Sequence, residues 1–425
     1  MAPVGSVLSP RKERVDRSKV TFSELQPLSV HFNGSVSKRK VSADREYTMD
    51  LWFARPGDIV VAKIDLKNGA VGIVPPDWEN VAVTGHFAVY EPVHERMLPE
   101  FFHLIIQASF FKAHLWRNKV GAEGRKEVKL DFFESEMIPV PPLATQQAIV
   151  AHWQATQNKN IAAHKAADEH EAALHRDFLG ALGLSNHAQG ITQRAFALRW
   201  TEIERWSVGS ARQTSGAFNL DNGRFSLVQL GDILSHVQYG TSVKANTEHR
   251  GTPILRMNNV HEGVMRFGDI KHIELPSNER NRLLMREGDI LFNRTNSKEL
   301  VGKCAVFHSA EEYVYASYLI RVRTTEHIAD PDYVAFVING PIGRQQIDGL
   351  SRQIIGQANV NSQELRSLRI PLPPLSIQKQ LVAEVTAARE HIAAERAAAE
   401  KLAADTAREV EEMILGQLRV PSFKI

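Results

Sequence analysis

The chain has 425 residues, more than one average hydrophobic core needs, so its length fits two to three domains. Its 51 Lys and Arg nearly balance 49 Asp and Glu, which excludes a histone-like excess of positive charge, and the single cysteine excludes an internal disulfide and a cysteine-rich zinc site. No apolar run reaches the roughly 18 residues of a membrane span, and residues 1–12 lack the apolar stretch of a signal peptide, so we expect a cytoplasmic protein without membrane contact.

The globular parts of the chain are predicted to be mixed α and β structure. Short apolar runs typical of strands are bounded by Asn, Gly and Pro turns, and each set of three runs is followed by a helical stretch. The strand-like runs lie at 58–64, 71–74, 87–90, 289–292, 304–307 and 318–322, the helical stretches at 99–116 and 331–347, and basic glycine-containing loops at 121–126 and 349–353.

An internal repeat organises these elements. Ile138–Gln146 (IPVPPLATQ) recurs as Ile370–Gln378 (IPLPPLSIQ) at an offset of 232 residues. Arg55–Val60 (RPGDIV) recurs as Arg286–Leu291 (REGDIL), offset by 231 residues. Matches in the same order along the chain are typical of a duplication, so we expect two copies of a domain followed by a helix.

Two weaker matches extend the repeat. Val71-Gly72 matches Val301-Gly302, and Phe22–Val30 resembles Trp200–Val208 at an offset of only 178 residues. The change in offset predicts that the second copy contains about 53 residues that the first copy lacks. The first copy is then either a smaller class of domain or incomplete at its start, and the Phe22–Val30 match favours the smaller class.

A long helix is predicted after each Pro-Pro junction. From Leu143 and from Leu375 the chain continues for about 40 residues without proline or glycine, rich in strong helix formers, until a closing glycine. In the second helix an apolar seam at 3–4 spacing runs through Leu381, Val385, Ala388, Ile392, Ala399, Leu402 and Val410. A narrow stripe on a rod of about 60 Å needs a partner, and the simplest partner is the other copy of the helix in antiparallel orientation. The alternative is that each helix packs separately on its own domain.

Sequence patterns of catalysis are absent. The chain has no phosphate-binding loop, and no Asn/Asp-Pro-Pro-aromatic motif of the kind that amino-methyltransferases use to hold a base. Its 17 histidines form no His-x-x-x-His or His-Glu-x-x-His pair, so we expect no metal site, and Cys304 is predicted to be a buried thiol. We therefore expect no catalytic residue in this chain.

Positive charge is concentrated in the two globular copies. Residues 1–136 and 197–370 have formal charges of +1 and +2, whereas the helical segments 143–184 and 375–418 have −1 and −3. The excess is small, and it suits a protein that reads base edges while a partner supplies part of the grip on the DNA backbone.

Together these residues resemble the specificity subunits of type I restriction-modification systems. The resemblance covers nearly the whole chain, and its most telling residues are the two Ile-Pro-x-Pro-Pro-Leu junctions that lead into long helices. Similar to the family as well are Arg55–Ile73, Gly251–Asn258 and Gly288–Lys303.

The resemblance implies a mixed α+β fold with two target-recognition domains, joined by two long antiparallel helices that form a coiled-coil spacer with pseudo-two-fold internal duplication. Each domain would read one half of a split double-stranded DNA target, and the helix pair would fix the gap. The boundaries follow as 1–142 and 197–374 for the recognition domains, 143–184 and 375–418 for the spacer helices, 185–196 for a linker and 419–425 for a tail.

The resemblance also implies that the chemistry belongs to partner subunits. Two methyltransferase subunits per chain would bring S-adenosylmethionine and modify adenines, and restriction subunits would use ATP and Mg²⁺ to translocate and cut DNA. The chain itself would be a non-catalytic subunit without a cofactor. The outward helix faces, including Glu390, Glu400 and Arg408, are expected to dock the methyltransferase subunits.

The DNA-facing residues that the resemblance implies are basic or amide side chains beside glycine and asparagine turns. Arg and Lys suit guanine O6 and N7, and Asn suits adenine. In the first copy they are Lys63, Arg125 and Lys126, and in the second copy Lys244, Arg256, Asn258, Arg294, Lys303 and Arg352. The competing interpretation is a coiled-coil adaptor whose globular domains bind protein rather than DNA.

Overall fold

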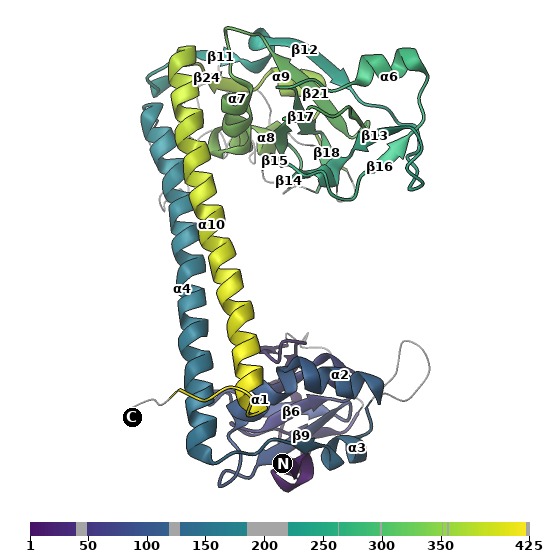
Figure 1. Cartoon of the computed structure of the whole chain (residues 1–425), viewed down its shortest axis with the longest axis vertical. Coiled ribbons are helices and arrows are strands. Elements are labelled where there is room, and N and C mark those ends of the chain that lie inside the picture. Colours follow the sequence, from purple (N-terminus) through teal and green to yellow (C-terminus); the bar gives the residue numbers. More distant parts are fainter. Residues whose placement is uncertain are drawn as a thin grey trace. The chain divides into compact units, whose positions relative to one another are not determined.

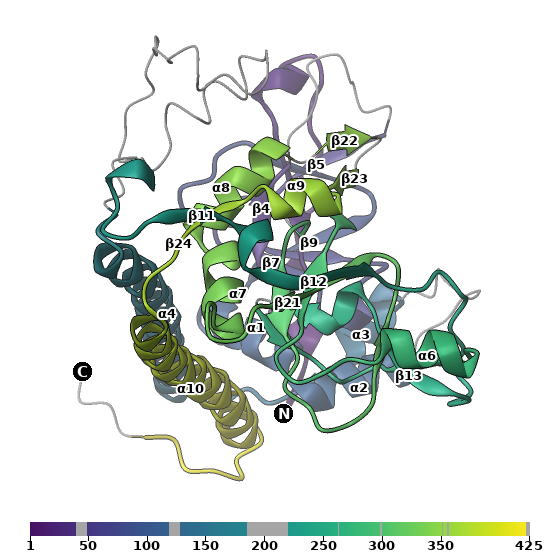
Figure 2. The ribbon, with the colours of Figure 1, turned by 90° about the horizontal axis from the view of Figure 1, so that it is seen from above.

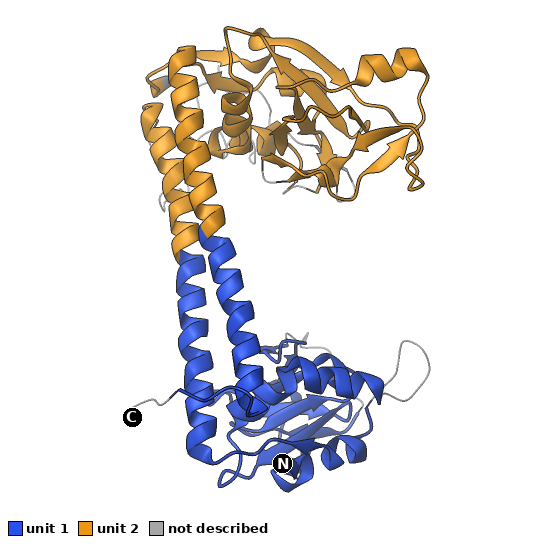
Figure 3. Cartoon of the chain, viewed as in Figure 1, with its two compact units in different colours: residues 1–165, 395–425 blue, residues 166–394 orange. Residues whose placement is uncertain are grey.

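A computed structural model of the chain describes residues 1–39, 49–118, 128–184, 220–261, 263–297, 300–350, 352–354 and 357–421. The chain divides into two compact units (Figure 3): Met1–Lys165 with Glu395–Ile425, and Ala166–Ala394. Both units combine sheets and helices, so the expected mixed fold class is confirmed.

The first unit is built on two four-stranded sheets, in the orders β2-β9-β6-β7 and β4-β3-β8-β5. Strand β6 is rich in valine and fully buried at its first three positions, and helices α1 and α2 contribute Phe101, Ile105 and Phe111 to the same core. The strands of this unit are β1 (Ala2–Pro3), β2 (Leu8–Pro10), β3 (Gln26–Val30), β4 (Val36–Lys38), β5 (Leu51–Phe53), β6 (Ile59–Ala62), β7 (Val71–Ile73), β8 (Val81–Thr84), β9 (Phe87–Pro92) and β10 (Met137–Ile138), and its short helices are α1 (Pro99–Gln107), α2 (Ser109–Arg117) and α3 (Leu130–Ser135).

The second unit repeats this plan with a four-stranded sheet in the order β12-β21-β17-β19 and a three-stranded sheet in the order β16-β13-β20. A further three-stranded sheet, β18-β23-β22, begins directly after β17. The strands are β11 (Leu227–Gln229), β12 (Leu234–Tyr239), β13 (Thr252–Leu255), β14 (Val260–His261), β15 (Val264–Met265), β16 (Lys271–Ile273), β17 (Ile290–Asn293), β18 (Thr295–Asn296), β19 (Cys304–Val306), β20 (Val314–Tyr315), β21 (Leu319–Thr324), β22 (Arg352–Ile354), β23 (Gln357–Asn359) and β24 (Arg369–Pro371), and the helices are α6 (Ser277–Leu283), α7 (Pro331–Asn339), α8 (Pro341–Leu350) and α9 (Ser362–Arg366).

The strand pairing corrects the predicted offset between the copies. Ala2 on β1 pairs with Ile138, and Val228 on β11 pairs with Ile370, the equivalent isoleucine of the repeat. Ala2 is therefore the equivalent of Val228, and Val4–Ser9 (VGSVLS) matches Leu230–Ser235 (LGDILS) at an offset of 226 residues. The two copies then differ by about six residues, so the prediction of about 53 extra residues in the second copy is wrong; Trp200–Val208 itself lies outside the described residues.

Two further sequence predictions need correction. Each helical stretch is a pair of helices: α1 and α2 are separated by Ala108 in an extended conformation, and α7 and α8 by Gly340 followed by Pro341. The strand pairing also makes Cys304, and not Val301, the equivalent of Val71. Val71 pairs with Val61 and Cys304 pairs with Phe292, and Val61 and Phe292 are each the third residue of their strand.

The long helices α4 (Leu143–Ala181) and α10 (Leu375–Ile414) run antiparallel within each unit. In the first unit His152 Nε2 lies 3.2 Å from Glu409 Oε2, and Ile149 shares a core cluster with Met413. In the second unit, where α4 and α10 lie side by side (Figures 1 and 2), His170 packs against His391, and Phe178 shares a core cluster with Leu381.

Every seventh residue of α10 forms a buried row: Val385, Ile392, Ala399, Thr406 and Met413. Leu402, predicted to lie in the seam, is 40% exposed and lies outside this row. The helix ends also pack on the domain cores, through Ile149, Val150, Met413 and Ile414 in the first unit and through Phe178, Leu179, Leu381 and Val385 in the second. Packing of the helices on each other and packing of each helix on its own domain were the two alternatives, and both occur, over different parts of the helices.

A buried glutamine fastens each helix to its domain at the repeated junction. Gln378 is fully buried; its Nε2 donates to Ile328 O (3.0 Å) and Pro373 O (2.8 Å), and its Oε1 accepts from Asp330 N (2.8 Å). Gln146 makes the equivalent bonds in the first unit, to Arg96 O, Pro141 O and Leu98 N. The final residue of the repeated motif therefore joins the long helix to the segment that starts α1 or α7.

The repeated Gly-Asp pair fixes a turn before the central strand. Asp289, with a fully buried side chain, accepts from Arg286 N (2.8 Å) and from Arg323 Nε and Nη2 (2.7 and 2.9 Å). Asp58 accepts in the same way from Arg55 N (2.7 Å), and its arginine partner is Arg11. Gly57 and Gly288 have φ values of 86° and 80°, a conformation that favours glycine. These turns fix where β6 and β17 start. Because both strands are four residues long, the turns also fix where they end.

Candidate DNA interface

Four residues of the second unit lie at one end of the main sheet, at or next to the ends of its strands. In the antiparallel order β12-β21-β17-β19, Tyr239 ends β12, Leu319 begins β21, Asn293 ends β17 and Cys304 begins β19. The flanking residues Tyr318, Arg294 and Lys303 are therefore neighbours at this end. We call Tyr239, Arg294, Lys303 and Tyr318 the strand-end surface of the second unit.

Arg294 is the best-defined donor of this surface. Its backbone N donates to Tyr318 O at 3.1 Å, and its guanidinium carbon lies 5.0 Å from the centre of the Tyr239 ring, a cation–π contact that orients the side chain. Within the described residues Arg294 Nε has no hydrogen-bond partner. That Nε atom is buried, so it is not open to an incoming acceptor, whereas the Tyr239 and Tyr318 side chains are 40% and 52% exposed and reach the surface at this end of the sheet.

The sheet β18-β23-β22 extends this surface. Thr295, Asn359 and Arg352 occupy one cross-strand row, in which Thr295 Oγ1 donates to Asn359 Oδ1 at 2.5 Å. Val360 N donates to Arg294 O at 2.9 Å, so the sheet is attached at the strand-end surface. Arg352 was expected in a loop; it lies on strand β22 instead, two strands from Thr295.

Arg256 and Asn258 lie beside this sheet, where Asn296 Nδ2 is 4.0 Å from Met257 Sδ. Arg256 Nη2 lies 3.0 Å from Asp269 Oδ2, and Asn258 Nδ2 lies 3.3 Å from the same oxygen. The Asp269 side chain is 76% exposed, so a carboxylate stands next to both donors and opposes an approaching phosphate. Lys244 is exposed in the loop after β12.

The first unit has the same surface with different side chains. Lys63 follows β6 as Arg294 follows β17, and Lys63 N donates to His86 O at 3.1 Å, as Arg294 N donates to Tyr318 O. Ala62 N donates to Ala70 O as Asn293 N donates to Lys303 O, so Ala70 stands where the second unit has Lys303. Lys63 Nζ donates to Gly85 O at 2.7 Å. Arg125 and Lys126 lie outside the described residues.

Cys304 is the first residue of β19 and directly follows Lys303 of the strand-end surface. It does not have the properties of a nucleophile. Its side chain is fully buried, and burial raises the pKa of its thiol to about 12, so the thiol stays protonated at neutral pH. This confirms the predicted buried thiol.

The sequence prediction selected Lys63, Arg294 and Lys303 at these strand ends but missed their neighbours. Tyr239, Tyr318 and His86 were not selected because they meet the basic residues only when four strands align. The sequence prediction does not include Asn296 and Asn359 either, although Asn296 stands two residues from Arg294 in the Gly288–Lys303 motif.

Comparison with known proteins agrees with this architecture. The family model described as "Type I restriction modification DNA specificity domain" matches residues 45–169 and 222–402, more than half of the chain. The chain therefore belongs to this family, as the sequence resemblance predicted.

Among its relatives is the type I restriction enzyme EcoKI specificity subunit of Escherichia coli K12, which is 27% identical over 285 residues. That match covers 65% of this chain but only 57% of the EcoKI subunit. The EcoEI specificity subunit of Escherichia coli is 21% identical over 441 aligned residues, which cover 87% of this chain and 73% of that subunit.

The same fold occurs in a chain of a solved structure whose description reads "Structural basis underlying complex assembly and conformational transition of the type I R-M system". The TM-score is 0.61 at 18% identity, over 98% of this chain and 97% of that one. In the part of this chain that the structure describes, no helix is both long and apolar enough to cross a membrane.

Proposed function

We propose that the chain reads a bipartite double-stranded DNA target, with one half-site recognised by each unit. The observation that carries the proposal is the strand-end surface, which occurs once per unit with the same backbone hydrogen bonds but different side chains. Lys63 and His86 in one unit, and Arg294 and Tyr318 in the other, offer different donors at equivalent positions. Two equivalent scaffolds with different contact residues suit two different half-sites.

Arg294 is proposed as the principal base-reading residue of the second unit. A guanidinium held over a tyrosine ring keeps a fixed plane, and its fork matches guanine O6 and N7. Lys303 and Arg352 would add phosphate or base contacts from the neighbouring strands. Arg256 and Asn258 are proposed as secondary contacts, because Asp269 already occupies their donors.

We further propose that methyltransferase subunits, two per chain, dock on the helices, and that restriction subunits join the assembly. Glu390, Glu400 and Arg408 are exposed on α10, outside the row of residues that packs inward. S-adenosylmethionine, ATP and Mg²⁺ would bind to these partners, and this chain would act without a cofactor of its own. Charge reversal at Glu390 and Glu400 should then release the methyltransferase from the co-purified complex.

A footprint of the complex with its methyltransferase partner tests the reading of DNA. The expected result is two short protected blocks that flank an unprotected middle. Arg294→Ala should weaken protection of one block by about tenfold or more, since a bidentate pair contributes about 1–3 kcal/mol. The matched control is Arg224→Ala, because Arg224 is exposed beside the end of α4, where its N donates to Leu182 O. A single continuous block, or a normal footprint with Arg294→Ala, would contradict the proposal and favour the adaptor interpretation.

A further inference from the structure

Two histidines that are far apart in sequence meet between the long helices. His170 lies on α4 and His391 on α10, both in the second unit, with their ring centroids 5.8 Å apart and the ring planes at 87°. Both side chains are exposed, at one end of an open groove whose floor is formed by Leu174, Phe178 and Leu381. Solutes therefore reach the pair from solvent.

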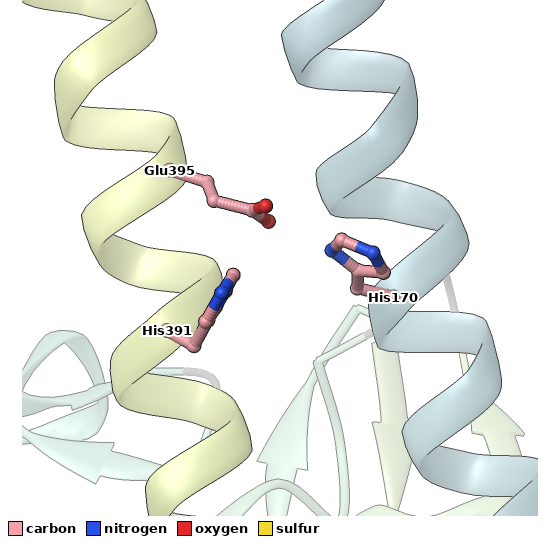
Figure 4. Close-up of side chains that lie close together, drawn as sticks. All are labelled: His170, His391 and Glu395. Atoms are coloured by element: carbon pink, nitrogen blue, oxygen red, sulfur yellow. The ribbon is translucent and has the colours of Figure 1, made fainter.

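A carboxylate completes the group. Glu395 follows His391 by one turn on the uninterrupted helix α10, and residues four apart lie on the same helix face. Each of the three side chains offers one ligand atom, and these atoms lie within 4.8 Å of one another (Figure 4). Within the ranges that the structure describes, no other three His, Cys, Asp or Glu side chains form such a group.

The chemistry of this group is that of a transition-metal site. Two imidazoles and one carboxylate, with a fourth position left for water, are a known ligand set for Zn²⁺. Zinc–ligand bonds of about 2.0–2.2 Å place tetrahedral ligand atoms about 3.4 Å apart. Side-chain rotations that bring the ligand atoms closer by up to about 1.4 Å reach that distance from the present 4.8 Å, and the two exposed histidines rotate readily.

We propose that His170, His391 and Glu395 bind a divalent transition-metal ion of the Zn²⁺ type, which cross-links α4 to α10. The bound ion would hold the two helices together at the level where the row of buried residues passes through Ile392. Metal supply would then set how readily this part of the helix pair opens. The site is separate from the strand-end surface and does not depend on the proposed reading of DNA.

The test is Zn²⁺ titration of the full chain, purified with a histidine-free tag, followed by calorimetry and by thermal unfolding. The wild type should bind one equivalent and unfold at a higher temperature with the metal. His170→Ala and His391→Ala should each lose at least tenfold in affinity, since even the loss of a second-shell partner costs about 10–100-fold. Glu395→Gln, which preserves the shape of the side chain, should weaken binding as well.

His249→Ala is the matched control. His249 also meets a second histidine, His272, edge to face with ring centroids 4.8 Å apart, but the two do not belong to any group of three metal-ligand side chains among the described residues. Unchanged Zn²⁺ binding in His249→Ala supports the proposal. No Zn²⁺ binding by the wild type, binding that persists in both His170→Ala and His391→Ala, or loss of binding in His249→Ala instead would each overturn it. Helix content measured without metal verifies that the variants fold.

Discussion

Replacing Gln378 with alanine should destabilise the second unit strongly, because this one fully buried side chain satisfies three backbone groups, of which Pro373 C=O is buried and the other two are part-buried. The substitution removes the partners of Asp330 N–H, Ile328 C=O and Pro373 C=O. An unsatisfied buried group costs about 1–3 kcal/mol, and a water that enters the vacated space restores part of this, so we expect a net loss of about 3 kcal/mol.

Urea unfolding followed by circular dichroism measures this loss. With a slope of about 2–3 kcal/mol per molar urea, the transition of the second unit should move down by about 1–1.5 M. The two units are expected to unfold in separate steps, so Gln146→Ala should lower the other transition by a similar amount.

Gln380→Ala is the control, since Gln380 is exposed two residues further along the same helix and, among the residues that the structure describes, its side chain donates only to Glu384 Oε1. It should shift the midpoint by less than about 0.3 M. If Gln378→Ala and Gln380→Ala unfold at the same urea concentration, the three bonds of Gln378 do not hold the junction together and the reasoning is refuted.

Three further outcomes follow from the structure. Asp289→Ala should lower the free energy of unfolding by about 3–5 kcal/mol, because Arg323 and Arg286 N lose their buried partner. Glu248→Ala, which breaks an exposed ion pair with Arg250, should lower it by less than about 1 kcal/mol. Equal urea midpoints for the two variants would contradict the argument. Cys304, with its thiol pKa raised to about 12 by burial, should react with thiol reagents only after unfolding, and rapid labelling of the native chain would show that the strand is open. Insertion of one heptad into each long helix, after Ala163 and after Ala398, should lengthen the helix pair by about 10 Å and widen the gap between the two DNA half-sites by about three base pairs. A change in the sequence of either half-site would contradict the spacer role.

The sequence predicted the helices and the central strands well, because their signals are local. Both long helices start at the leucine after Pro-Pro, and the strand-like runs at 58–64, 71–74 and 87–90 contain β6, β7 and part of β9. The start of the first copy was misplaced for the opposite reason. Val4–Ser9 shares little more than one glycine and a Leu-Ser pair with Leu230–Ser235, and only the pairing of β1 with β10 and of β11 with β24 makes the equivalence plain.

The candidate sites depend on contacts between distant residues, which periodicity does not report. Tyr239, Arg294 and Tyr318 meet because three strands end or begin at one end of a sheet, and Asp269 approaches Arg256 through a turn. His170 and His391 are 221 positions apart, so a search for closely spaced histidines misses them. The sequence therefore identified basic residues near the proposed interface but neither their aromatic neighbours nor the carboxylate that competes for two of them.

The most direct test of the central claim is a map of methylated adenine in the host genome, with and without this gene. We predict that deletion removes methylation from one split motif, whose two halves are the sequences read by the two units. Substitution of Arg294 should then relax one half of the motif and leave the other half unchanged. If the chain is produced together with its methyltransferase partner and no motif changes on deletion, the chain does not direct DNA recognition and the account is contradicted.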